Sequence, residues 1–311
     1  MSQRKSSRAP AVHLRGLVKR YGDTTILDNL DLDVRAGEVH GFLGPNGAGK
    51  STTVRILMGE LRCDAGEVSV LGLDPWADAV ALHRRTAYVP GDVELWPNLT
   101  GGEILDVLGR LHGGTDRARR DALVDRFSLD LTRKGRQYSK GNRQKVALVV
   151  AMSTDADLFL FDEPTSGLDP LMESEFQHCV HELTRRGATV LLSSHILAEV
   201  EALADRISVI RDGRIVETGT LEEMRHLSRT TVTVRAGEPV TDLADLPGVH
   251  DPEVLGEDAC HVRFDAESAD LAAVIRALGE HDVRSISAAP PSLEQLLLRH
   301  YGRADDGRAD A

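Results

Sequence analysis

The chain has 311 residues, of which 41% are hydrophobic, 28% are charged and only 4% are aromatic, and its formal net charge at pH 7 is −12. This length suggests one large domain or two smaller ones of ordinary globular composition. The acidic charge and the scarcity of aromatic rings argue against nucleic-acid binding, and no apolar run approaches the ~20 residues of a membrane-spanning helix. We therefore expect no nucleic-acid partner, and any membrane-spanning component to be a separate chain.

The cysteines and the first residues indicate the compartment. Cys63, Cys179 and Cys260 lie far apart in the sequence without metal-binding spacing, which suggests free thiols in a reducing environment. Residues 1–10 are polar and basic and lack the apolar segment of a signal peptide, so we expect a disordered tail. Both features favour a cytoplasmic protein.

Apolar residues that recur between Val12 and Val34 predict short strands, with turns at Tyr21-Gly22-Asp23 and Ala36-Gly37. Tyr21 has two interpretations. Its ring is either exposed and able to stack on an adenine, or half-buried at the end of a strand, and the sequence alone favours the second.

The next stretch matches a phosphate-binding pattern. It fits G-x-x-x-x-G-K-[ST] and comprises Gly44, Pro45, Asn46, Gly47, Ala48, Gly49, Lys50, Ser51 and Thr52. An apolar run before it predicts a buried strand, and an apolar run after it predicts a helix, which is the context that this motif requires. Glycines let backbone N–H groups point at phosphate oxygens. Lys50 supplies a charge for the β- and γ-phosphates, and Ser51 offers its hydroxyl to Mg²⁺.

The region after the P-loop helix predicts further α/β elements and then a helical block. We expect a strand over Gly66–Leu71, a helix over Asp74–Arg85 and a strand over Thr86–Val89. Thr100 and Glu103 have the spacing of a capping box at the start of a helix. We interpret residues of about 92–155 as a helical insertion in an α/β frame.

Polar residues at helix and strand ends supply further candidates. Ser139-Lys140-Gly141-Asn142 precedes the apolar run Val146–Met152, and is compatible with an anion site or with an ordinary helix cap. Leu158–Phe161 ends in Asp162-Glu163, which suits a buried strand that delivers Asp162 to Mg²⁺ and Glu163 to a water, although a solvated strand end has the same pattern.

His195 follows the predicted strand Ala188–Leu192. A lone histidine there is usually structural, but at the same sheet edge as the P-loop it would reach a γ-phosphate. The chain then predicts a hairpin around Asp212-Gly213.

The pattern changes after residue 225. Strands are predicted over 230–235, 261–264 and 283–286, and helices over 271–278 and 292–300, which together describe a small α+β domain over 226–302. Residues 303–311 are expected to be a disordered tail. Residues 226–311 hold 16 acidic residues, 8 arginines and no lysine, so this region also differs in charge.

Taken together, these motifs resemble those of the ATP-binding subunit of an ABC (ATP-binding cassette) transporter over about residues 12–225. In this resemblance Tyr21 matches the adenine-stacking aromatic, and Gly44–Thr52 matches Walker A. The stretch Ser139–Gln144 matches a divergent signature, and Asp162-Glu163 matches the end of Walker B. The stretch Ser166–Asp169 matches the D-loop, and His195 matches the switch histidine.

The resemblance implies a P-loop NTPase (RecA-like) core over residues 11–225, with an N-terminal antiparallel β-subdomain and the helical insertion. It implies that two such chains dock head-to-tail and hold ATP and Mg²⁺ between Walker A of one and the signature of the other. The implied catalytic residues are Glu163, His195 and Lys50. The metal ligands are Ser51 and Asp162, and further nucleotide contacts come from Tyr21, Ser139, Gly141 and Asp169. It also implies a separate integral membrane permease and a peripheral position on the inner face of the cell membrane.

Two motifs, the Q-loop and the signature, depart from the family pattern, and the tail suggests a subfamily. Gly91 stands where the family has the Q-loop glutamine, and Lys140 and Asn142 replace the usual glycine and glutamine of the signature. Asp92 is a candidate for the vacant role near Mg²⁺, or else a solvated loop residue. The stretch Pro291–Tyr301 looks like the tail of daunorubicin-resistance cassettes, which export drugs or antibiotics.

Other functions remain open beside export. An importer subunit shares the same motifs. A non-transport ABC ATPase of DNA repair is disfavoured because only 88 residues separate Lys50 from Ser139, too few for a long coiled coil, and a ribosomal one because there is a single cassette with an acidic tail. A GTPase is disfavoured by the lack of an N-K-x-D motif.

Overall fold

The computed structural model describes residues 9–111, 114–226, 230–240, 243, 246–256, 259–267, 270–279 and 281–289. The contacts divide the chain into two compact units, Met1–Thr218 and Gly219–Ala311. This division falls at the end of strand β9 (Arg214–Gly219), and the domain boundary expected after residue 225 stays a prediction. The expected helix over 292–300 and tail over 303–311, like most of the expected N-terminal tail, lie outside the described residues.

A six-stranded sheet forms the centre of the first unit, with the order β5-β6-β7-β3-β8-β9. Its strands are β3 (Val39–Leu43), β5 (Thr86–Val89), β6 (Leu158–Asp162), β7 (Thr189–Ser194), β8 (Arg206–Arg211) and β9 (Arg214–Gly219). The pairs from β5 to β8 are parallel, and β3, β6 and β7 are buried along their whole length. Such continuous apolar strands are typical of a parallel sheet that is covered on both faces.

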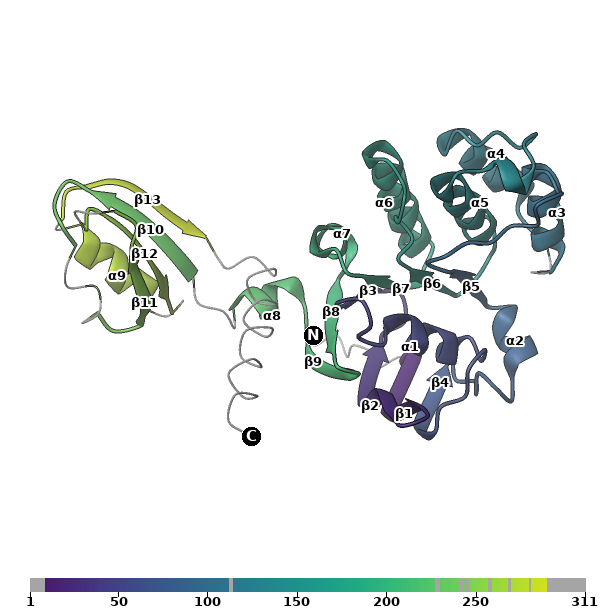
Figure 1. Ribbon diagram of the computed structural model, residues 1–311, viewed down its shortest axis with the longest axis horizontal. Coiled ribbons are helices and arrows are strands. Elements are labelled where there is room, and N and C mark those ends of the chain that lie inside the picture. The colour runs from purple at the N-terminus through teal and green to yellow at the C-terminus, as the bar shows by residue number, and fades with distance from the viewer. Residues whose placement is uncertain are drawn as a thin grey trace, which may run out of the picture. The chain divides into compact units, whose positions relative to one another are not determined.

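One face of this sheet is covered by a helix and a second sheet. Helix α1 (Lys50–Leu57) lies between the six-stranded sheet and the antiparallel sheet β2-β1-β4, as Figure 1 shows. The strands of that sheet are β1 (Val12–Tyr21), β2 (Thr24–Val34) and β4 (Ala65–Val70). One buried cluster joins the three layers and includes Leu14 of β1, Leu57 of α1 and Leu160 of β6. Helix α1, and the P-loop before it, are therefore fixed by packing on both sides.

Helices cover the opposite face (Figure 1). They are α3 (Gly101–Leu111), α4 (Arg117–Arg126), α5 (Lys140–Met152), α6 (Pro170–Arg185) and α7 (Leu197–Leu203), with a short 3₁₀ turn η1 (Gly135–Gln137). The predicted capping box is confirmed, because Thr100 N donates to Glu103 Oε2 at 2.7 Å and Glu103 N donates to Thr100 Oγ1 at 3.3 Å.

The helix predicted over Asp74–Arg85 is too long. The structure has only α2 (Ala79–His83) there, preceded by turns. The carboxylate oxygen Oδ1 of Asp74 accepts hydrogen bonds from Trp76 N at 2.8 Å and Ala77 N at 2.9 Å. This side chain competes with the helical hydrogen bonds of its own backbone, so the helix begins later.

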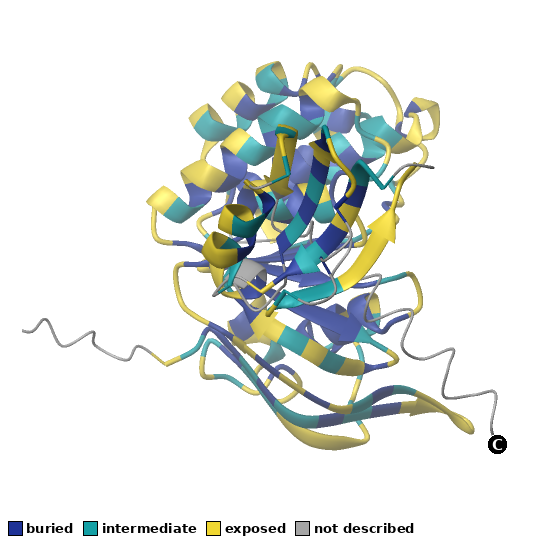
Figure 2. Cartoon of the chain, turned by 90° about the vertical axis from the view of Figure 1, so that its left-hand side faces the viewer, coloured by how far each residue is buried: buried dark blue, intermediate teal, exposed yellow. Residues whose placement is uncertain are grey.

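The second unit has helices and a sheet with a core of their own. It contains α8 (Leu221–His226), β10 (Thr230–Ala236), β11 (Val249–Val254), β12 (His261–Ala266), α9 (Leu271–Leu278) and β13 (Val283–Ala289). The sheet is antiparallel with the order β11-β12-β10-β13. Buried residues alternate with less buried ones along β10 and β12 (Figure 2). Val232, Phe264 and Leu278 belong to its buried cluster.

Strand β11 was not predicted from the sequence. It is an edge strand, it contains Pro252, and most of its residues are exposed. An edge strand tolerates proline because one side of it has no partner, and it lacks the apolar alternation that identifies a half-buried strand.

The separate cores predict separate stabilities. Phe264 is 1% exposed in the core of the second unit, so Phe264→Ala is expected to destabilise that unit by about 3–5 kcal/mol. Nucleotide binding by the first unit should persist. Scanning calorimetry of the whole chain with and without ATP measures both effects, with Arg263→Ala at an exposed position of the same strand as the control. Loss of the ATP-dependent stabilisation in Phe264→Ala would contradict the independence of the two cores.

Candidate nucleotide-binding site

The P-loop connects β3 to α1 in a conformation that needs glycine. Gly47 and Gly49 have φ values of 83° and 108°, in the left-handed region that other residues rarely adopt. A Cβ atom added to Gly44 would lie 2.4 Å from the carbonyl oxygen of Ile210. The loop is thus held close to β8 on one side, while a Cβ on Gly47 would meet nothing within 4 Å. Phosphate oxygens fit a loop that is curled and open at this point.

Lys50 lies inside the loop. Its side chain is 4% exposed, and Nζ donates to Gly44 O at 2.7 Å and to Pro45 O at 3.1 Å. Nζ also lies 3.4 Å from Glu163 Oε1. Burial lowers the pKa of Lys50, and the carboxylates of Glu163 and Asp162 act in the opposite direction. A buried ammonium among acceptors is the group that a polyphosphate requires from this loop.

The carboxyl ends of β6 and β7 bring the second half of the site to the same edge. Asp162 ends β6 and is buried, and its Oδ1 accepts a hydrogen bond from Ser193 Oγ of β7. Glu163 N donates to Ser193 O at 3.0 Å. His195 Nδ1 lies 3.3 Å from Glu163 Oε1. The structure therefore brings together four candidate site residues from three distant stretches of the sequence, namely Lys50, Asp162, Glu163 and His195.

Glu163 adopts a strained backbone conformation. Its φ is 49°, which is uncommon for a residue with a side chain and is found preferentially at functional sites. This turn places its carboxylate between Lys50 and His195 instead of continuing the strand direction.

A buried carboxylate that the sequence analysis missed supports this edge of the sheet. Glu199 of α7 is 8% exposed, and it accepts hydrogen bonds from Thr165 Oγ1 at 2.5 Å and from Ser194 Oγ at 2.6 Å. It thereby connects the loop after Glu163 to the end of β7, next to His195. A glutamate in a helix is usually exposed, so no sequence signal identified this role.

A metal ion at this edge would need ligands beyond the protein. No group of three or more His, Cys, Asp or Glu side chains within the described ranges is arranged to hold a metal. The hydroxyl of Ser51, which is exposed, and the carboxylate of Asp162 suit Mg²⁺ that is shared with phosphate oxygens and water.

The signature residues lie elsewhere in the same chain. Ser139 caps α5, since its Oγ accepts from Asn142 N at 3.3 Å. Lys140 Nζ donates to Ser166 Oγ at 2.9 Å, and a Cβ on Gly141 would lie 2.2 Å from Gly167 O. The signature thus packs against the D-loop of its own chain. Helices α5 and α1 lie on opposite faces of the sheet (Figure 1), so Ser139 and Gly141 do not join the Lys50 cluster.

Two other predicted nucleotide contacts make local interactions of their own. Asp169 caps α6 by accepting from Met172 N at 3.0 Å. Tyr21 ends β1 and is 49% exposed, with Lys19 Nζ 5.5 Å from its ring centroid. Tyr21 thus lies at the end of a strand with about half of its surface exposed, and its stacking on an adenine stays a prediction.

Gly91 borders the site without contributing a side chain. A Cβ on Gly91 would lie 3.2 Å from Asp162 O and 3.8 Å from Glu163 Cβ. Asp92 next to it is exposed.

Comparison with known proteins agrees with this geometry. The family model described as ABC transporter matches residues 27–166. The daunorubicin resistance ATP-binding protein DrrA3 of Streptomyces coeruleorubidus is 40% identical over 96% of this chain and 97% of its own. The Nod factor export ATP-binding protein I of Ralstonia nicotianae is 33% identical over 94% of each chain. A solved ATP-binding subunit of an ABC transporter, with 31% identity, superposes with a TM-score of 0.65 over 70% of this chain and 92% of its own. The expected P-loop NTPase architecture is thereby confirmed.

The geometry predicts the effect of removing the buried ammonium. Lys50→Ala should reduce ATP hydrolysis by about 100-fold or more, because a cation at the phosphates contributes about 2–4 kcal/mol in a desolvated site. The measurement is phosphate release by the purified chain, with circular dichroism to establish that the variant is folded. Lys145→Ala in α5 serves as the matched control and should keep wild-type hydrolysis. Undiminished hydrolysis by Lys50→Ala would contradict the assignment.

Proposed function

The chain belongs to the ABC transporter family and is an ATPase, and we propose that it powers a separate membrane permease that exports a drug, an antibiotic or another small molecule. The observation that carries the proposal is the cluster of Lys50, Asp162 and Glu163 at one sheet edge, in a chain whose full-length relatives are named for drug resistance and export. Those names favour export over import and over the roles in DNA repair or on ribosomes.

The roles of the residues follow from their positions. The carboxylate of Glu163 orients and polarises the attacking water, and its contact with His195 fixes its direction. Lys50 and His195 stabilise negative charge on the γ-phosphate. Ser51 and Asp162 hold Mg²⁺, which neutralises phosphate charge when bound. Tyr21 stacks on the adenine.

A second copy of the chain completes the site. Ser139 and Gly141 lie at the start of α5, away from Lys50 of the same chain, and Ser139 is exposed. In a head-to-tail pair these residues, with Asp169 of the D-loop, would approach the nucleotide on the P-loop of the partner. Closure of the pair on ATP and its reopening after hydrolysis would then drive the permease.

The proposed location is the inner face of the cell membrane, where the chain is peripheral. None of the helices in the described parts of the chain has the length and apolar character needed to cross a membrane. The second unit, expected over 226–302, is proposed to contact the permease or the second copy.

Purification of the tagged chain from detergent-solubilised membranes tests the transport role. An integral membrane protein is expected to co-purify with it and to stimulate its ATPase activity on reconstitution. Recovery with ribosomes or DNA-repair proteins, and no membrane protein, would contradict the proposal.

The assignment of Glu163 predicts a trapped complex. Glu163→Gln keeps the shape and hydrogen bonding of the side chain but removes the base, so ATP should close the dimer and hydrolysis should not reopen it. Size-exclusion chromatography with Mg²⁺ and ATP should show a persistent dimer. Glu173→Gln in α6 is the matched control and should stay wild-type. A Glu163→Gln variant that binds ATP yet remains monomeric would contradict the role of Glu163 or of the signature.

The lack of a side chain at Gly91 leads to a prediction about its neighbour Asp92. No side chain at Gly91 can reach the metal, and we propose that the neighbouring carboxylate of Asp92 takes this role when the dimer closes. Asp92→Ala should raise the Mg²⁺ concentration for half-maximal hydrolysis several-fold, while nucleotide binding in EDTA stays unchanged. Glu94→Ala, two residues further on, is the control. An unshifted Mg²⁺ titration of Asp92→Ala would leave Asp92 as a solvated loop residue.

A further inference from the structure

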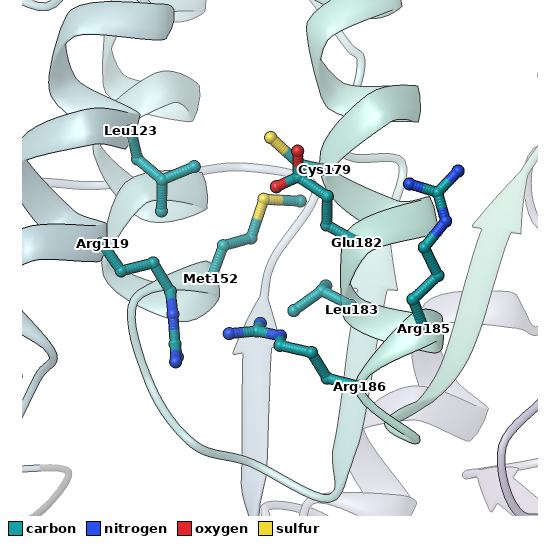
Figure 3. Close-up of a pocket in the computed structure, with 8 residues that line it drawn as sticks. All are labelled: Arg119, Leu123, Met152, Cys179, Glu182, Leu183, Arg185 and Arg186. Carbon is teal, nitrogen blue, oxygen red and sulfur yellow. The ribbon is translucent and has the colours of Figure 1, made fainter.

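A cavity in the first unit lies apart from the nucleotide site. It has a volume of about 320 Å³ and is formed by α4, the end of α5 and α6 (Figure 3). Its floor consists of buried side chains that present hydrocarbon and sulfur atoms to the cavity, namely Leu123, Met152, Cys179 and Leu183. None of the residues that line it belongs to the Lys50 cluster. The floor is suited to an apolar group.

Charged side chains form the rim of the cavity. Arg119 donates to Thr154 O at 3.0 Å and to Asp155 Oδ1 at 2.9 Å, and Glu182 is paired with Arg126 at 2.9 Å. Figure 3 shows the side chain of Arg186 extending below Met152 and Leu183 toward the side of the cavity on which Arg119 lies. Arg185, by contrast, points away from the cavity.

Arg186 contributes a second positive charge to the rim of the cavity. Its side chain has no hydrogen bond or ion pair with any residue that the structure describes. Burial lowers the pKa of Arg186, and the charge of Arg119 acts in the same direction, whereas the carboxylates of Asp155, Glu182 and Asp116 act in the opposite direction. Two cations that approach one another over an apolar floor are stabilised by an anion placed between them.

From these features we propose that the cavity binds a single-chain amphiphile, with the apolar chain on the floor and an anionic head between Arg119 and Arg186. An inorganic anion would leave the floor unused, and a volume of about 320 Å³ suits one short alkyl chain. Because the net charge of the chain is −12, attraction of an anion has to come from this local pair.

The cavity lies between two parts of the first unit, so a bound ligand would contact both of them. Arg119, Leu123 and Met152 belong to the helical insertion, whereas Leu183 and Arg186 belong to α6 and its end. Helix α6 begins at Pro170, and Asp169 of the D-loop caps its start. A bound amphiphile therefore connects the helical insertion to the helix that follows the D-loop, and should raise the melting temperature of the first unit.

Calorimetric titration of the whole chain tests the site with two probes, decanoate and decyl phosphate, which differ in the chemistry of the head. At least one should bind with a 1:1 stoichiometry below its micelle concentration. Arg186→Gln should weaken that binding about tenfold or more, because it removes the charge that faces the head. Arg185→Gln, one residue away, should bind like the wild type. Decyltrimethylammonium, which has the same tail and the opposite charge, should not bind, and saturating ATP should not displace the anionic probe.

Several results would overturn the proposal. These are binding of neither anionic probe, equal affinity in Arg186→Gln and the wild type, equal binding of decyltrimethylammonium, or displacement by ATP. The melting temperature of Arg186→Gln without a ligand should match that of the wild type, and Arg186→Lys, which keeps a cation, should retain part of the affinity.

Discussion

The buried ammonium of Lys50 and the carboxylate of Glu163, 3.4 Å apart, meet at one edge of the parallel sheet. Each group would be costly to bury alone, because desolvation disfavours an isolated charge. The encounter depends on β3 and β6 running in the same direction with β7 between them, so that the P-loop and the end of Walker B follow strands that finish at the same edge. The buried layers on both faces of the sheet maintain this alignment.

Much of the first unit could be predicted from the sequence because its signals are local. The P-loop pattern between an apolar strand and an apolar helix identified β3 and α1, and the capping box at Thr100 identified the start of α3. Signals that depend on one side chain or on the surroundings were less reliable. The Asp74 carboxylate delays α2, and the exposed strand β11 with its proline has no alternating pattern.

Residues of the candidate site could be predicted where they belong to a sequence motif. They could not be predicted where their role depends on burial in the folded chain. Lys50, Asp162 and Glu163 were identified by type and spacing. Glu199 has no such spacing, yet it is buried and bonded to Thr165 and Ser194 from different elements. Residues that we propose to act across two chains form a third class. The structure of one chain holds Ser139 at the start of α5, and its proposed partner is the P-loop of another copy.

Mixing two inactive variants tests most directly whether two chains share each site. Lys50→Ala retains an intact signature, and Ser139→Arg, at an exposed position, retains an intact P-loop. Each variant alone should be inactive, since every site in its dimer is damaged. In a mixed dimer the P-loop of the Ser139→Arg chain meets the signature of the Lys50→Ala chain, so an equimolar mixture should regain ATP hydrolysis. A mixture no more active than its separate components, or a Ser139→Arg variant with wild-type hydrolysis, would contradict the shared site.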